Sequence, residues 1–249
     1  CDFALGTDSG GSIRVPAAAC GICGIKAGPE AWPRDGALLL DPILDSIGIL
    51  APVVDDLIYL YECAASQDAS TSRSAAFHFL IPCPEELAAL DDEMRCRFDL
   101  LTDRISSAAQ FQRLDFKLGF DASLEIRKTL IAAGLCELLR RRGVAPDRLP
   151  RNVQAVWALG RELATTQIDQ ARAAAAAMAQ RLQAVLEDGT IIVAPVLPAR
   201  PPRSSGGACP SDSARGGMIN RFLALANVCG LPALSIPVES AAADLPLSV

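Results

Sequence analysis

Twelve residues near the start of the chain, GTDSGGSIRVPA (residues 6–17), place two adjacent glycines between Ser9 and Ser12 and follow them with Arg14 and Pro16. Glycine permits positive φ and a close approach of the backbone to a ligand, at an entropic cost. Such a loop can serve a tight turn, a phosphate group or a reacting carbonyl. Deciding among these three uses requires evidence from the rest of the sequence.

Two phosphate-binding patterns, G-x-x-x-x-G-K-[ST] and G-x-G-x-x-G, are missing from the chain. The nucleophile-elbow pattern G-x-S-x-G is missing as well, and its base would have to be His78, the only histidine. His78 stands between two phenylalanines in an expected strand, which is typical of a structural histidine. An activated serine in this chain therefore needs another base, and lysine is the realistic alternative.

Nine cysteines are scattered along the chain, and this odd number fits reduced thiols in a cytoplasmic protein. Cys20 and Cys23 form a C-x-x-C pair, but there is no second pair of this kind. With a single histidine in addition, a four-ligand zinc site lacks its other half. We therefore expect Cys20 and Cys23 to be small packing residues, and we predict no metal and no organic cofactor.

The composition also limits the class of partner. A net charge of −6 argues against a nucleic-acid-binding face, and the basic run at residues 140–142 fits a solvated helix end. No apolar run approaches the roughly 20 residues that span a bilayer. With 51% hydrophobic residues in 249, the chain can bury one large core or two small ones. We expect neither nucleic acid nor a membrane as a direct partner.

The elements that must position the opening loop alternate between helices and apolar strands, which indicates the α/β class. The first 27 residues are expected to form a buried loop that enters a packed core. Helices are expected at residues 55–64, 85–105, 122–142 (ended by Gly143), about 153–187 in one or two pieces, and 220–226. Strands are expected at residues 77–81, 190–194 and 233–238, the last two buried on both faces, with a long loop at 195–212.

The segment GTDSGGSIRVPAAACGICGIK, residues 6–26, resembles the signature segment of the amidase signature family, whose pattern is close to G-[TS]-D-[TS]-G-G-S-[IV]-R-x-P-A-x-x-C-G-x-x-G-[LIF]-K. Three later stretches are similar to other motifs of that family: LDSIG at 44–48, IVAP at 192–195 and NVCGLPALSIP at 227–237. They follow in the family's order, so the resemblance extends from residue 6 to residue 237. It implies the amidase-signature fold, a mixed β-sheet core covered by helices.

The resemblance also implies roles for the opening loop. Ser12 matches the nucleophile, and Asp8 and Arg14 match positions that brace the loop, although a local turn carboxylate and a surface arginine are the simpler alternatives. The implied oxyanion hole consists of the backbone N–H groups of Ser9, Gly10, Gly11 and Ser12. Converging amides of this kind are worth roughly 2.7–4 kcal/mol per donor in studied hydrolases.

The base of this family is a lysine upstream of the signature, acting through a serine at a cis peptide bond, and both would precede residue 1. Lys26 matches a structural lysine of the pattern, and Lys117 and Lys128 lie far downstream. We therefore interpret the chain as part of a longer protein, incomplete at both ends and inactive alone. Its expected parts are a nucleophile-bearing core segment (1–60), a variable helical region (62–165) and returning core strands (188–249).

The function implied by the resemblance is that of an amidase-type hydrolase, whose Ser12 attacks a small linear carboxamide and forms an acyl-enzyme. The variable stretches at 62–165 and 195–220 would set the substrate. One alternative is the glutaminase-type A subunit of an aminoacyl-tRNA amidotransferase, and a second is a non-catalytic, degenerate scaffold. A phosphate-binding module is the most distant reading. The assemblies implied are a homodimer or a complex with the partner subunits of an amidotransferase.

Overall fold

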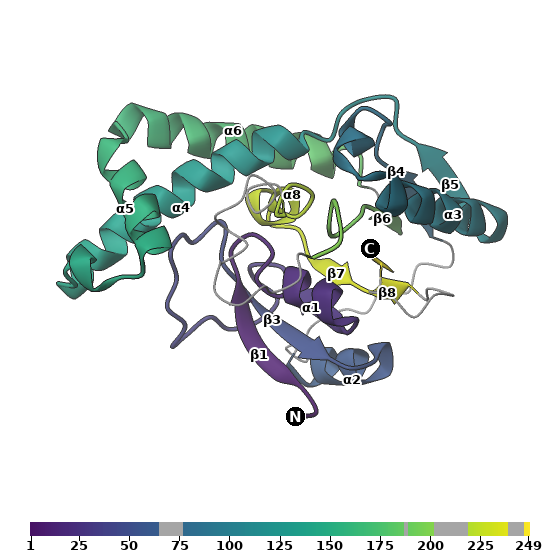
Figure 1. Ribbon diagram of the computed structural model, residues 1–249, viewed down its shortest axis with the longest axis horizontal. Helices are drawn as coiled ribbons and strands as arrows, with labels where there is room; N and C mark the ends of the chain where they lie inside the picture. The colour runs from purple at the N-terminus through teal and green to yellow at the C-terminus, as the bar shows by residue number, and fades with distance from the viewer. Residues whose placement is uncertain (65–76, 187–188, 202–218, 239–246) are drawn as a thin grey trace.

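The computed structural model of the protein describes residues 1–64, 77–186, 189–201, 219–238 and 247–249 (Figure 1). Its strands are β1 (Ala4–Asp8), β2 (Cys23–Lys26), β3 (Ser46–Ala51), β4 (His78–Ile81), β5 (Gln110–Arg113), β6 (Thr190–Ile192), β7 (Ala233–Ser235), β8 (Pro237–Val238) and β9 (Leu247–Ser248). Its α-helices are α1 (Arg14–Cys20), α2 (Val54–Ala64), α3 (Asp92–Ala108), α4 (Phe120–Arg142), α5 (Arg151–Glu162), α6 (Thr165–Gln183) and α8 (Ala224–Val228). Two short 3₁₀ helices are η1 (Glu86–Ala89) and η2 (Pro146–Arg148).

Three strands from the N-terminal part of the chain and β7 from near its C-terminal end form an antiparallel sheet in the order β1-β3-β2-β7. Glycines in its strands leave room for α1: an ideal Cβ at Gly48 would lie 2.5 Å from Cγ1 of Ile13, and one at Gly24 would lie 2.8 Å from Cβ of Ala17. Helix α1 therefore packs directly on the sheet. Residues 9–13 form the turn that joins the end of β1 to the start of α1, and we call this turn the signature loop.

The expectation of a buried loop at residues 1–27 is wrong, because this stretch contains β1, α1 and β2. The first strand pairs with β3, so that Ala4 lies opposite Leu50 and Asp8 opposite Ser46. The small residues of β1 hide the alternation of apolar and polar side chains that is typical of a strand. Its pairing partner, β3, lies some forty positions further along the chain. A pairing between such distant segments leaves no local signal in the sequence.

A second, parallel sheet has the order β5-β4-β6, with His78 of β4 opposite Gln110 and Thr190. Helix α3 forms the crossover from β4 to β5, as parallel strands require. In the described part of the chain β6 is an edge strand, and Ile191 is 38% exposed. The prediction of a strand buried on both faces is therefore wrong at residues 190–194.

The expected strand at 233–238 is wrong in the same respect. It divides into β7, which joins the antiparallel sheet, and β8, which pairs with β9. Leu234 is 39% exposed. Of the loop expected at 195–212, residues 202–212 lie outside the described residues.

Helix boundaries follow local signals where a capping residue is present. Helix α4 ends at Gly143, whose φ is 62°, as predicted. The expected helix at 85–105 instead begins at residue 92, where Asp91 accepts a hydrogen bond from the N–H of Met94 (2.8 Å). The long helix expected at 153–187 is two helices, α5 and α6. The last expected helix begins at Ala224, four residues later than predicted.

Helix α4 is anchored at its start and at its middle, which defines its position relative to the rest of the fold. The Glu86 carboxylate accepts hydrogen bonds from three N–H groups at the start of α4, from residues 118–120 (2.7–3.2 Å). An ideal Cβ at Gly134 would lie 2.2 Å from the carbonyl oxygen of Leu40, and one at Gly160 would lie 2.2 Å from that of Ala132. These glycines let the backbones approach closely, and α4 packs against α5, α6 and α8.

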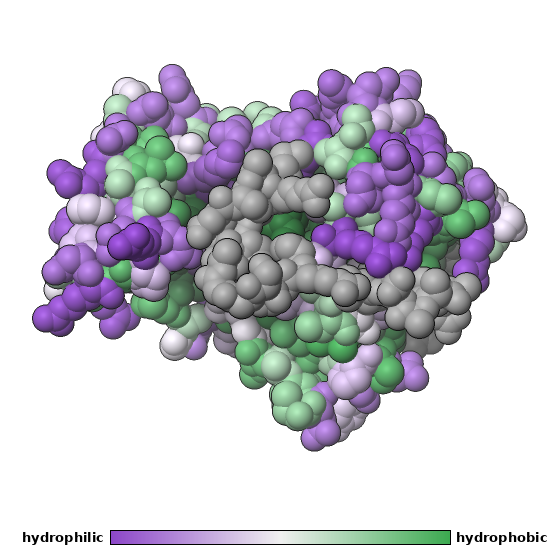
Figure 2. Space-filling model, viewed as in Figure 1, coloured by the Kyte–Doolittle hydropathy of each residue, from purple (hydrophilic) through white to green (hydrophobic). Residues whose placement is uncertain are grey.

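Apolar residues also reach the surface. Figure 2 shows an apolar area on the part of the molecule that contains β1, β3 and α2. The exposed apolar side chains of these elements and their neighbours include Phe3 (47%), Leu5 (68%), Val53 (52%) and Ile58 (52%). Among the described residues, none of the helices combines the length and the apolar character that crossing a membrane requires.

Candidate active site

The signature loop connects a strand that ends in a buried carboxylate to a helix that begins with a buried guanidinium. Asp8 and Arg14 are 0% and 2% exposed, whereas Ser12, between them, is exposed. Gly11 has a φ of 121°, which opposes any residue with a side chain. Its carbonyl accepts the N–H of Val15 (2.7 Å), so the first turn of α1 begins inside the loop. The local sequence thus presents Ser12 at the surface.

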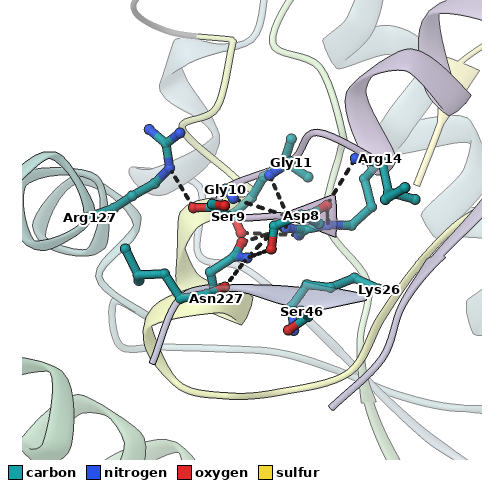
Figure 3. A network of polar contacts seen from close by, with 12 residues as sticks. Asp8, Ser9, Gly10, Gly11, Arg14, Lys26, Ser46, Arg127 and Asn227 are labelled. Atoms are coloured by element: carbon teal, nitrogen blue, oxygen red, sulfur yellow. Dashed lines mark hydrogen bonds and ion pairs between the residues drawn. The ribbon is translucent and has the colours of Figure 1, made fainter. Parts of the chain in front are cut away.

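Asp8 organises the loop from beneath. Its carboxylate accepts hydrogen bonds from the N–H groups of Gly10 (3.0 Å), Gly11 (2.6 Å) and Ile13 (3.2 Å) (Figure 3). The Arg14 guanidinium donates to the same carboxylate at 2.9 and 3.1 Å. Burial alone would raise the pKa of Asp8, but the Arg14 charge and these hydrogen bonds hold it well below its usual range. Asp8 is therefore a fixed negative charge that braces the loop.

Asn227, in α8, completes this network from the other end of the chain. Its Nδ2 donates to the carbonyl of Asp8 (2.9 Å), to the Asp8 carboxylate (3.0 Å) and to the carbonyl of Leu44 (2.9 Å), while its Oδ1 accepts from Arg14 (2.6 Å). Asn227 is fully buried. It opens the NVCGLPALSIP stretch but was absent from our predicted site residues. Its partners lie more than 180 positions away in sequence.

These contacts differ from the predicted oxyanion hole. The N–H groups of Gly10 and Gly11 point inward to Asp8 and are engaged there. Within the described part of the chain, the N–H groups of Ser9 and Ser12 have no such acceptor. In this arrangement only the Ser9 and Ser12 amides are free to receive a reacting oxygen, and their role stays a prediction.

Arg127 of α4 is the second residue that the sequence did not reveal. Its Nε donates to the carbonyl of Ser9 (3.0 Å), across 118 positions. An ideal Cβ at Gly10 would lie 1.6 Å from that same Nε, so the arginine occupies the space that a side chain would need. The peptide unit between Ser9 and Gly10 is thus held on its carbonyl side by Arg127 and on its N–H side by Asp8 (Figure 3).

Lys26 lies buried in β2 beside the Asp8–Arg14 pair. Its Nζ donates to the carbonyl of Ala27 (2.9 Å) and to Oγ of Ser46 (3.1 Å). Burial and the Arg14 charge lower its pKa to about 8, against a smaller opposing effect of Asp8. Both hydrogen bonds of Lys26 stay within the sheet, as expected of a structural lysine.

The other candidates for a base lie elsewhere. His78 belongs to β4 of the parallel sheet (Figure 1). The exposed Lys128 pairs with Glu125 on α4. Among the described residues, no histidine or lysine forms a hydrogen bond with Ser12. The structure of the described residues therefore assigns no base to this serine.

Neither cysteine of the C-x-x-C pair has a partner for metal chemistry among the described residues, which contain no group of three or more histidine, cysteine or acidic side chains able to hold an ion. Cys23 is buried in the core near β3, and burial raises the pKa of its thiol. Cys20 is exposed, so the expected packing role is wrong for that residue.

Comparison with known proteins gives the same family as the signature segment. Residues 1–94 match the sequence model of the Amidase family. In Thermosynechococcus vestitus, the A subunit of glutamyl-tRNA(Gln) amidotransferase is 35% identical over 135 residues, which are 54% of this chain and 26% of that protein. A fatty acid amide hydrolase of Medicago truncatula is 24% identical over 279 residues, which are 100% of this chain and 45% of that protein. The chain thus spans less than half the length of these relatives.

Solved structures share the fold over nearly all of the chain. A crystal structure of an amidase superposes with a TM-score of 0.83 and 23% identity, covering 99% of this chain and 57% of that one. The A subunit of the glutamyl-tRNA(Gln) amidotransferase of Thermotoga maritima superposes with a TM-score of 0.78 and 22% identity over the same shares. The predicted amidase-signature fold is therefore confirmed. Residues 1–94 thus resemble the Amidase family in sequence, and the chain shares the fold of these solved structures.

Proposed function

We propose that the protein containing this chain hydrolyses small carboxamides, with Ser12 as its nucleophile. The observation that carries the proposal is the position of Ser12, an exposed residue on a turn that the buried Asp8–Arg14 pair braces from beneath. A braced turn of this kind presents the Ser12 hydroxyl to a substrate. The amidase relatives support a hydrolase that acts on amides.

In the proposed reaction the Ser12 hydroxyl attacks the amide carbonyl, and its proton passes to a base. The carbon–nitrogen bond then breaks, the nitrogen leaves as ammonia or an amine after receiving that proton, and water releases the acyl group from Ser12. The Ser9 and Ser12 N–H groups, which Asp8 does not engage, would receive the developing oxyanion. The base is expected to be a lysine outside residues 1–249.

The second candidate is the amide-hydrolysing component of a glutamine-dependent amidotransferase. The 35% identity to such a component in Thermosynechococcus vestitus favours this reading over other specialised amidases. The chemistry at Ser12 would be the same, but the ammonia would pass to another protein of the complex. A preference for glutamine over other amides, and activity that depends on a co-expressed partner, would distinguish the two.

The test uses the longest natural protein that contains residues 1–249, with and without Ser12→Ala. We expect ammonia release from a panel of small carboxamides and covalent labelling by a fluorophosphonate, both lost in the Ser12→Ala variant while its circular dichroism is unchanged. Ser106, a hydroxyl on α3 that bonds to the carbonyl of Asp103, provides the matched control, and Ser106→Ala should keep full activity. Turnover by Ser12→Ala at a tenth of the parent rate or more would place the nucleophile elsewhere.

A further inference from the structure

Arg127 holds a positive charge beside the signature loop with few partners to compensate it. The side chain is mostly buried, and burial lowers its pKa. Of its five N–H donors, one bond is made, from Nε to the carbonyl of Ser9. Figure 3 shows the two terminal nitrogens turned away from Ser9 and Asp8. Within the described residues they have no hydrogen-bond or ion-pair partner.

The neighbouring carboxylates do not supply a counterion. Asp8 and Asp45 both act on Arg127 through space. Asp8, however, is already paired with Arg14, and Asp45 accepts the N–H of Asp41 (3.1 Å). Neither forms an ion pair with Arg127. A mostly buried charge is costly unless it is paired, so the free end of this guanidinium is suited to receive an anion.

The position of Arg127 relates that anion to the proposed reaction. Ser9, which Arg127 contacts, precedes Ser12 by three residues, a distance of at most about 10 Å along an extended chain. The anion would therefore lie in the neighbourhood of the carbonyl that Ser12 attacks, so that a short substrate would contact both residues. Arg127 also belongs to the helical region 62–165, where we expect substrate selection.

We propose that Arg127 is a specificity-determining residue that binds the carboxylate of the substrate, so that the preferred substrates are short monoamides of dicarboxylic acids. The two terminal nitrogens of a guanidinium match the two oxygens of a carboxylate in a planar, bidentate pair. This proposal rests on the proposed hydrolysis of an amide at Ser12, but the experiment that tests it does not require that hydrolysis. Binding can be measured without turnover.

The experiment titrates the Ser12→Ala protein with succinamate and with butyramide by calorimetry. The two ligands have the same amide and similar length, and differ in ending with a carboxylate or a methyl group. We expect succinamate to bind at least about tenfold more tightly, because charge-assisted bonds to a partly buried arginine are strong. Acetate, a free carboxylate without the amide, should bind more weakly than succinamate. Equal affinities for succinamate and butyramide would overturn the proposal.

Arg127→Gln removes the charge while keeping an N–H donor, and it should abolish the preference without changing butyramide affinity more than about twofold. Arg127→Lys keeps the charge and should retain part of the preference. Lys128→Gln is the matched control: it removes a cation at the next position of α4, where the side chain is exposed and paired with Glu125, and it should leave the preference intact. A full preference in Arg127→Gln would overturn the proposal.

Salt provides a test that needs no substitution at Arg127. Raising the ionic strength should weaken the binding of succinamate but not that of butyramide, and a salt-independent preference would contradict the proposal. The two proposals fail separately. Ser12-dependent hydrolysis of butyramide without a carboxylate preference would leave only the amidase proposal standing. A preference that depends on Arg127 without any turnover would leave only the anion site.

Discussion

Replacing Gly10 by alanine tests whether Arg127 is clamped over the signature loop. The ideal Cβ at this position would lie 1.6 Å from Nε, 2.4 Å from Cζ and 2.6 Å from Cδ of Arg127, so the guanidinium must move. Gly10 is not among the glycines with positive φ, and the backbone itself therefore accepts alanine. The cost of Gly10→Ala should come from Arg127 alone.

The magnitude follows from the bond that is lost. A hydrogen bond from a charged group contributes about 1.5–3 kcal/mol to stability. Alanine in place of glycine at a compatible φ returns about 0.4–1 kcal/mol by restricting the unfolded chain. Gly10→Ala should therefore lower the free energy of unfolding by roughly 1–2 kcal/mol. In the Arg127→Ala background the same substitution should be neutral or slightly stabilising.

The assay is urea denaturation of the parent, both single variants and the double variant, which together form a double-mutant cycle. We expect a coupling energy of about 1.5–3 kcal/mol between the two positions. Gly28→Ala is the control, because its Cβ would meet nothing within 4 Å, and it should cost little in either background. If the effects of Gly10→Ala and Arg127→Ala add to within about 0.5 kcal/mol, Arg127 does not occupy the space above Gly10 and the reasoning is refuted.

Two further predictions concern the same region. Gly11→Val should destabilise the fold by on the order of 1–3 kcal/mol and also impair amide hydrolysis. The reason is that φ at Gly11 is 121° and that a Cβ there would lie 2.6 Å from Cδ1 of Leu223. A valine variant with parental stability and activity would show that the loop has another conformation. Burial lowers the pKa of Lys26 from 10.5 to about 8, so between these pH values the unfolded chain binds more protons than the folded one. Stability should consequently rise with pH over this window by up to about 3 kcal/mol relative to a Lys26→Met variant, and parallel pH profiles for the two proteins would contradict the shift.

The features that depend on neighbouring residues could be predicted from the amino-acid sequence. The glycine pair, with Ser12 after it, predicts a tight turn, and the backbone at Gly11 indeed has a conformation that only glycine adopts readily. The stop of α4 at Gly143 follows from the same conformational freedom. The order of four motifs along the chain predicted the fold that the solved structures share. In each case the physical cause lies within a few positions of the residue concerned.

Only the tertiary structure showed how distant elements complete the candidate site. Asn227 joins Asp8 and Arg14 because α8 packs beneath the signature loop, and Arg127 reaches Ser9 because close backbone contacts hold α4 in place. The inward turn of two amides toward Asp8 likewise depends on this packing, since a buried carboxylate needs hydrogen bonds in compensation. The contacts of Asn227 and Arg127 join residues more than 100 positions apart, and no local periodicity or spacing encodes them.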